Sequence, residues 1–155
     1  MKPSVYLDTT IPSYLFDERK SLKFLSDITR KWWSEEHMRY EVFISRETVA
    51  ELRGGDYPRR DEILAFVSDL EILAPMPPIA DIAQEYIRHR LMPNELRGDA
   101  MHLAYASYYR MDFLLTWNCN HLANANKKKH VRIINSQLDL HTPEIITPLE
   151  LFSER

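Results

Sequence analysis

Five short runs of β-branched, aromatic and leucine residues recur along the chain, and each is separated from the next by a longer stretch whose apolar residues have helical spacing. The runs occupy residues 5–7, 42–44, 70–73, 113–115 and 145–146. Strands that are joined through helices need crossover connections, which lead to parallel pairing. The pattern therefore predicts an α/β fold, a three-layer α/β/α sandwich around a central five-stranded parallel sheet.

The helices between these strands are predicted from apolar spacing and from helix-ending residues. Apolar side chains at positions 22, 25, 28 and 32 predict one amphipathic helix over residues 20–36. The pair Gly54-Gly55 ends a short helix, and Pro58 suits the first turn of the next one. Residues 118–138 are expected to be helical with a break.

Length and composition exclude several classes of protein. A chain of 155 residues that is 45% hydrophobic predicts one compact domain over residues 1–155. Cys119 is the only cysteine, which excludes an intrachain disulfide framework and a multi-cysteine metal site. The three glycines form no phosphate-binding loop. Because no stretch approaches the roughly 20 apolar residues that span a bilayer and no signal peptide is visible, a cytoplasmic protein without a membrane span is expected.

Three acidic residues lie where the carboxyl ends of the predicted strands would meet. Asp8 directly follows the first run, Glu51 lies six residues after Ser45 at the end of the second, and Asp99 begins a helix after Gly98. Ligand sites of open parallel sheets lie beyond this edge. Each residue alone also has a structural explanation: Asp8 as a helix cap, Glu51 as a solvent-exposed helix residue, and Asp99 as a carboxylate that complements the helix dipole.

The residues after the fourth run belong to the same edge. Thr116 and Asn118 add a hydroxyl and a carboxamide there, although either could cap the following helix. Three converging carboxylates repel one another unless a cation or a proton joins them. Mg²⁺ or Mn²⁺ prefers such oxygen ligands, and a bound ion can activate water and offset charge on a phosphoryl oxygen. Phosphodiester hydrolysis is the predicted chemistry.

The chain resembles the PIN domain family, the metal-dependent nuclease fold of VapC-type toxins. The matching segments are residues 5–10, 45–52, 98–104 and 114–118, with 143–151 similar to the family's last strand and following turn. The resemblance implies a metal-dependent endoribonuclease that acts on RNA, with a small antitoxin as its partner in a type II toxin–antitoxin pair.

The resemblance also implies which residues carry the activity. Asp8, Glu51 and Asp99 would be the catalytic metal ligands, and Asn118 would complete the ligation where many members carry a fourth acidic residue. Because an amide replaces a carboxylate at Asn118, a second metal ion should bind more weakly. Ser45 or Thr116 would orient the ligands through a neighbouring hydroxyl group.

Basic and aromatic residues outside this set suggest contacts with nucleic acid. A protein of net charge −3 that binds a polyanion must concentrate its positive charge locally. The candidates for phosphate contact are Arg97, Lys127, Lys128, Lys129 and Arg132, and a second cluster is Arg53, Arg59 and Arg60. Solvated charges remain the alternative for both. Trp117 could stack on a base or pack in the core.

Two possible histidine sites are weaker. His102 lies three residues after Asp99, but a di-iron bundle needs two such pairs, so a packed histidine is the alternative to a ligand. Cys119 and His121 have poor spacing for zinc.

Large apolar residues exceed what one face of each helix needs, and a homodimer contact or an antitoxin groove would cover them. They are Trp32, Trp33, Tyr108, Tyr109 and Met111.

Two other functions are open. One is a non-catalytic RNA-binding or regulatory module with a degenerate metal site, suggested by Asn118. The other is a phosphatase of the haloacid dehalogenase type, which Thr10 disfavours because a carboxylate is required two residues after the nucleophile.

Overall fold

Parallel strands form the centre of the molecule in the computed structural model, which describes residues 1–92 and 98–154. Within these residues the strands are β1 (Ser4–Leu7), β2 (Glu41–Ser45), β3 (Glu71–Leu73), β4 (Phe113–Leu115) and β5 (Glu144–Ile146). They make one five-stranded sheet in the order β3-β2-β1-β4-β5, and every neighbouring pair is parallel. The predicted parallel sheet is confirmed.

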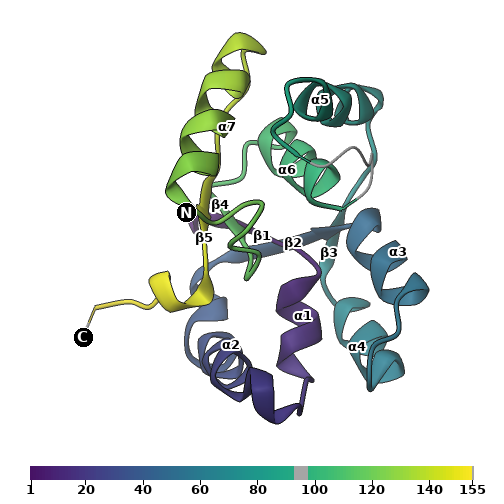
Figure 1. Ribbon diagram of the computed structural model, residues 1–155. Helices are drawn as coiled ribbons and strands as arrows, with labels where there is room; N and C mark the ends of the chain where they lie inside the picture. The colour runs from purple at the N-terminus through teal and green to yellow at the C-terminus, as the bar shows by residue number, and fades with distance from the viewer. Residues whose placement is uncertain (93–97, 155) are drawn as a thin grey trace.

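Helices cover both faces of this sheet. In the described residues they are α1 (Thr10–Leu15), α2 (Lys23–Glu36), α3 (Arg46–Gly54), α4 (Arg60–Val67), α5 (Pro77–Arg88), α6 (Asp99–Tyr108) and α7 (Ala125–Gln137). Short 3₁₀ turns lie at Lys20–Leu22, His37–Arg39 and Pro148–Glu150. Figure 1 shows α1 to α4 on one side of the sheet and α5 to α7 on the other. The predicted three-layer sandwich is therefore confirmed.

The central strand β1 explains why both faces are covered. Its side chains alternate, so that Val5 and Leu7 pack with the α1 to α4 layer and Tyr6 packs with the α5 to α7 layer. All three are fully buried. A strand buried on both faces carries a continuous apolar run rather than an alternating one, and residues 5–7 have that pattern.

Some helix boundaries differ from the prediction. Residues 118–124 do not form a helix: Asn118 accepts hydrogen bonds from the backbone N–H groups of Leu122 and Ala123, and the Asn124 side chain caps α7 by accepting from Lys127 N at 2.9 Å. Helix α4 begins at Arg60, after a left-handed Arg59, so the expected place of Pro58 in its first turn is wrong. The helix expected from residue 20 begins at Lys23, after a 3₁₀ turn.

None of the helices in the described residues combines the length and the apolar character that crossing a lipid bilayer requires.

Candidate functional site

The site lies at the point in the sheet where successive strands of the chain stop being added on one side of β1 and begin to be added on the other side. From β1 the chain continues to β2 and β3 on one side, and β4 and β5 lie on the other. Ligands of open α/β sheets bind at such a switch point, beyond the carboxyl ends of the strands. Asp8 follows β1 and its backbone N–H donates to Leu115 O of β4 at 3.2 Å, so the ends of these two strands lie together.

Asp8 is a buried carboxylate, 2% exposed, that is held by hydroxyl and amide groups. Its Oδ1 accepts from Thr10 N at 3.0 Å and from Thr10 Oγ1, and its Oδ2 accepts from Thr116 Oγ1. Burial raises the pKa of Asp8 to about 6, although His102 and the two threonines act in the opposite direction. One oxygen therefore contacts Thr10, the first residue of α1, although the N-cap of this helix is Thr9 and not Asp8, while the other oxygen faces the end of β4.

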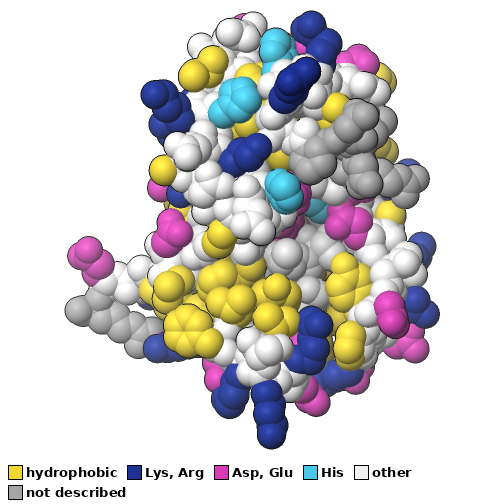
Figure 2. Space-filling view, viewed as in Figure 1, with side chains coloured by type: hydrophobic (Ala, Val, Ile, Leu, Met, Phe, Trp, Pro, Cys, Tyr) yellow, Lys and Arg dark blue, Asp and Glu magenta, His cyan; other side chains and the backbone are white. Residues whose placement is uncertain are grey.

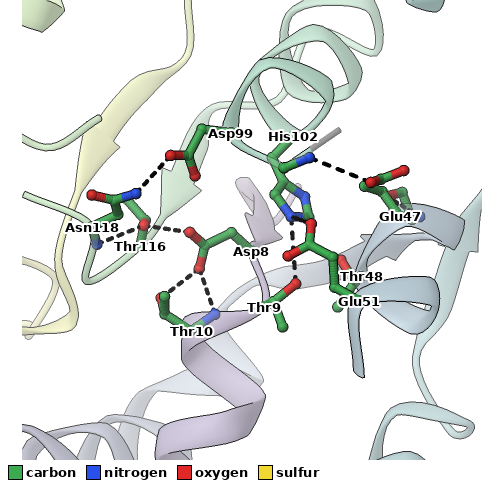
Figure 3. A network of polar contacts seen from close by, with 12 residues as sticks. Asp8, Thr9, Thr10, Glu47, Thr48, Glu51, Asp99, His102, Thr116 and Asn118 are labelled. Atoms are coloured by element: carbon green, nitrogen blue, oxygen red, sulfur yellow. Dashed lines mark hydrogen bonds and ion pairs between the residues drawn. The ribbon is translucent and has the colours of Figure 1, made fainter. Parts of the chain in front are cut away.

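Asp99 and Asn118 form the second part of the site. Asn118 Nδ2 donates to Asp99 Oδ2 at 2.6 Å, and Asn118 N donates to Thr116 Oγ1 at 2.9 Å (Figure 3). Asn118 Oδ1 accepts from His121 N at 3.1 Å, so both ends of its amide are engaged. Burial raises the pKa of Asp99, with the charge of Glu51 acting in the same direction and those of His102 and His121 opposing it.

Glu51 lies nearby but has a different partner. Its Oε1 is 2.7 Å from His102 Nε2. Although burial acts to raise the pKa of Glu51, the hydrogen bond and charge of His102 and a hydrogen bond from Thr9 lower it overall. Figure 3 shows the Glu51 carboxylate facing His102 and Thr9, whereas Asp8 and Asp99 face the Thr116 and Asn118 side. Among the described residues, no group of three or more His, Cys, Asp or Glu side chains is arranged to hold a metal ion.

His102 is a buried, doubly partnered histidine, which is the alternative to a ligand that the sequence leaves open. Its Nδ1 lies 2.6 Å from Tyr6 Oη and its Nε2 lies 3.4 Å from Thr9 Oγ1. Burial opposes its charged form, but Tyr6, Glu51 and Asp8 raise the pKa of His102 well above its ordinary value.

A match to a known family determines to which protein family the chain belongs. The PIN domain family matches residues 5–127. The chain belongs to the PIN domain family. The matched range includes the four predicted ligands, Asp8, Glu51, Asp99 and Asn118, and ends at Lys127, near the start of α7.

Solved PIN-like structures share the fold at low sequence identity. VapC20 from Mycobacterium tuberculosis, a toxin that cleaves the sarcin-ricin loop, is 12% identical with a TM-score of 0.58, over 76% of this chain and 92% of that chain. VapBC2 from Rickettsia felis, bound to a DNA fragment from its promoter, is 15% identical with a TM-score of 0.53, over 92% of this chain and 97% of that chain. Comparison with curated protein sequences gives no match.

The other residues predicted for the PIN site lie at different distances from its centre. Thr116 bonds directly to Asp8, whereas Ser45 lies beyond His102: its Oγ caps α3 by accepting from Glu47 N at 3.2 Å and lies 2.7 Å from Tyr6 Oη. Three further residues of this network were not predicted from the sequence: Tyr6, Thr10 and Glu47, whose Oε1 accepts from Gly98 N at 3.3 Å. Only Thr10, two residues after Asp8, fits a local side-chain-to-backbone motif that the sequence could have indicated.

The basic residues of α7, with Arg97, form the first predicted phosphate-binding cluster, and only some of them are available to a ligand. Lys127 Nζ donates to Leu91 O at 2.5 Å, and Lys128 Nζ lies 4.0 Å from Glu150. Lys129 and Arg132 are exposed. Arg97 lies outside the described residues.

Two residues of the second basic cluster, Arg59 and Arg60, and also Trp117 have contacts within the protein. Arg59 pairs with Glu18 and Glu62, and Arg60 donates to Arg53 O at 3.2 Å. Trp117 Nε1 donates to Thr29 Oγ1 at 2.7 Å and the ring packs at the edge of the α1 to α4 layer, which favours the packing interpretation.

Proposed function

We propose that this PIN domain protein is a metal-dependent endoribonuclease that hydrolyses RNA phosphodiester bonds and is the toxin of a type II toxin–antitoxin pair. Its membership of the PIN family and the fold it shares with VapC20 and VapBC2 support the proposal. The observation that carries it is the pair of carboxylates at the switch point of the sheet, the buried Asp8 and the half-buried Asp99, where burial raises the pKa of both.

The two carboxylates fit a divalent ion. Asp8 is buried and Asp99 is half-buried. Burial and, to a smaller extent, the charge of Asp99 raise the pKa of Asp8, and both carboxylates present the hard oxygen atoms that Mg²⁺ and Mn²⁺ prefer. A cation removes the unfavourable energy of two neighbouring charged groups that are shielded from water. Asp8 and Asp99 would hold the ion, and Glu51 and Asn118 border the same space. Such an ion, when bound, would supply an activated water nucleophile at neutral pH and would offset negative charge on the phosphoryl oxygen.

The other residues of the site orient these carboxylates. Thr10 and Thr116 fix the two oxygens of Asp8, and Asn118 fixes Asp99. Groups that lock a ligand's orientation reduce the rearrangement needed when the ion and the substrate bind. Lys129 and Arg132, together with Arg97, are proposed to contact RNA phosphates.

Cleavage of RNA tests the function directly. Purified protein is incubated with labelled single-stranded RNA in Mn²⁺, in Mg²⁺ and in EDTA, beside Asp99→Asn and the matched surface control Asp81→Asn, which changes an exposed carboxylate of α5. We expect metal-dependent cleavage by the wild type and by Asp81→Asn, and at least about a hundredfold slower cleavage by Asp99→Asn, since charge stabilisation of this kind contributes factors of that size. Equal cleavage by all three proteins identifies a contaminating nuclease and removes support for the proposal.

A non-catalytic RNA-binding or regulatory module is the second candidate. Asn118 favours it, because an amide that donates to Asp99 stands where a carboxylate would strengthen metal binding. Calorimetry separates the two functions. Absence of heat when Mn²⁺ is added to the wild type, together with RNA binding that EDTA does not change, supports the module.

The proposed partners are an antitoxin, as in the VapBC2 complex, and a second copy of the chain. Trp32 and Met111, two of the residues that suggested a homodimer, are buried in the core, whereas Trp33 is half-buried and stacks on His37 with the ring centroids 4.0 Å apart. We further propose that residues 1–155 form one PIN domain that acts in the cytoplasm. Light scattering at monomer mass would exclude the homodimer.

A further inference from the structure

We infer that His102 is a positioning residue that holds Glu51 apart from Asp8 and Asp99, so that a divalent ion is bound by two carboxylates of this chain instead of three. This inference deepens the proposed function and rests on it. The observations that carry it are the contacts of His102 with Glu51 and Tyr6 and the separation of the carboxylates in Figure 3.

The imidazole of His102 is fixed on both sides. Nδ1 is 2.6 Å from Tyr6 Oη, which in turn is 2.7 Å from Ser45 Oγ, and Nε2 is 2.7 Å from Glu51 Oε1. These groups come from β1, the end of β2, α3 and α6, and Tyr6, Ser45 and His102 are buried. The ring therefore cannot turn without breaking its contacts with Tyr6 of β1 and Glu51 of α3.

The contact of His102 with Glu51 is a close approach of Nε2 to a carboxylate oxygen rather than a hydrogen bond of regular geometry, because Glu51 Oε1 has no hydrogen-bond partner among the described residues. An ionised carboxylate has no proton to give, so any proton between the two groups belongs to Nε2 of His102. Tyr6 Oη can donate to Nδ1 or accept from it, because Ser45 Oγ can take the complementary role. Nε2 can therefore carry its proton with the imidazole neutral or charged, and the inference does not depend on the protonation of His102.

This contact of His102 competes with any cation for Glu51. The Glu51 carboxylate is directed at His102 and Thr9, while Asp8 and Asp99 are directed at the Thr116 and Asn118 side of the site (Figure 3). To ligate an ion that Asp8 and Asp99 share, Glu51 would have to leave a 2.7 Å contact with the buried His102, where electrostatic attraction is screened less than in water. Tyr6 contacts only Nδ1 of His102, so Glu51 is the acidic partner of Nε2.

Mn²⁺ titration calorimetry on single and double variants tests the inference. Asp8→Asn and Asp99→Asn should lower the Mn²⁺ affinity by about tenfold or more, whereas Glu51→Gln should stay within about threefold of the wild type. His102→Leu removes the donor and frees Glu51 to turn, so it should raise the affinity by about threefold or more. The double variant His102→Leu/Glu51→Gln should lose that gain.

Conservative and metal-free measurements separate positioning from simple packing. His102→Gln keeps an N–H donor for Glu51 and should restore wild-type affinity. Urea unfolding in EDTA is measured for His102→Leu, Glu51→Gln and the double variant. The change in unfolding free energy of the double variant should differ from the sum of the two single changes, because both residues take part in one contact that does not need a metal. Glu51→Gln decides the question even where His102→Leu does not fold.

Two outcomes overturn different statements. If Glu51→Gln lowers the Mn²⁺ affinity as much as Asp8→Asn does, Glu51 is a direct ligand and the inference is wrong while the proposed function stands. If the wild type binds no Mn²⁺, the proposed function fails first. Additive unfolding energies in EDTA would also contradict the inference, because His102 would then not hold Glu51.

Discussion

Asp8 has an unfavourable charge at neutral pH in the folded state without a bound cation. Its pKa is raised by burial from 3.8 to about 6, so between about pH 4 and pH 6 the folded protein retains a proton that the unfolded chain has lost. Stability falls over this range as the pH rises, and above it the ionised group costs about 3 kcal/mol of unfolding free energy. Asp8→Asn should therefore raise the melting temperature of the metal-free protein at pH 7.5, although loss of the Thr116 hydrogen bond offsets about 1 kcal/mol of the gain.

Thermal unfolding in EDTA at pH 7.5 and at pH 4 checks this expectation. The gain of Asp8→Asn should disappear at pH 4, where Asp8 is protonated in the folded protein, and Asp81→Asn should change little at either pH. Added Mn²⁺ should raise the melting temperature of the wild type but not of Asp8→Asn, because only the folded wild type binds the ion. A variant that melts lower than the wild type at pH 7.5 would show that the Asp8 hydrogen bonds outweigh its buried charge.

Asn118 stands where the resemblance to PIN proteins implies a fourth acidic ligand. Asn118→Asp replaces the N–H donor to Asp99 with a second negative charge at the same position. Without metal the two carboxylates repel, so the variant should unfold at lower urea concentration at pH 7.5. With Mn²⁺ the added charge should increase the affinity by about tenfold. Calorimetry and urea unfolding measure both effects, and a variant that is both less stable and weaker in Mn²⁺ binding would remove Asn118 from the metal site.

Helix α6 begins at a backbone conformation that requires glycine. Gly98 has φ +78° and ψ −132°, a region that side chains with a Cβ atom rarely adopt, although an added Cβ would meet no atom within 4 Å. Gly98→Ala should therefore cost about 1–3 kcal/mol through the backbone alone. Because Gly98 N donates to Glu47 Oε1 and precedes Asp99, the variant should also weaken Mn²⁺ binding.

Gly54→Ala is the matched control for this substitution. Gly54 is in α3, has no positive φ, and an added Cβ would also meet no atom within 4 Å. Alanine there should be neutral or stabilising by up to about 1 kcal/mol, since it lowers the entropy of the unfolded chain. Equal unfolding free energies for the two variants, measured in urea, would contradict a glycine-specific start of α6.

The elements themselves could be predicted from local sequence, but their polar partners could not. All five strands follow from short apolar runs bounded by helical stretches. The buried face of α2 was less predictable, because it includes Ser26, Thr29 and Glu36. Thr29 accepts from Trp117, and Glu36 accepts from Ser153 near the C-terminus, so their burial depends on residues far along the chain. Spacing along one helix carries no information about such contacts.

The same limit applies to the site. Strand ends placed Asp8, Thr116 and Asn118 at one edge of the sheet, because parallel topology brings these ends together. The orientation of Glu51 depends on the rotation of α3 about its axis and on the contact of α3 with α6, which place Glu51 against His102. A four-residue spacing pattern fixes which residues share a face of one helix but not how two helices are rotated against each other.

Over the whole molecule, positive charge is spread out while the site itself is acidic. Figure 2 shows Lys and Arg side chains mainly around the periphery of this face and a group of hydrophobic side chains across its lower part, over α1, α2 and the C-terminal segment. With 20 Lys and Arg residues against 23 Asp and Glu residues, the chain has no net positive charge to attract RNA. Lys127 and Lys128 contact Leu91 and Glu150, which leaves Lys129 and Arg132 as the exposed cations of that cluster in the described residues.

Salt dependence of RNA binding tests whether these two residues contact phosphate. Each phosphate contact to a single strand contributes about 0.7 to the slope of log affinity against log salt, so Lys129→Ala/Arg132→Ala should reduce the slope by roughly 1.4. Anisotropy of labelled RNA in EDTA, with Asp99→Asn present in every protein, measures binding without cleavage. The control Lys20→Ala/Lys23→Ala removes two exposed lysines from the opposite layer and should leave the slope unchanged. If both pairs reduce the slope equally, the RNA contacts are diffuse, and if neither does, the cations that bind RNA lie elsewhere on the protein.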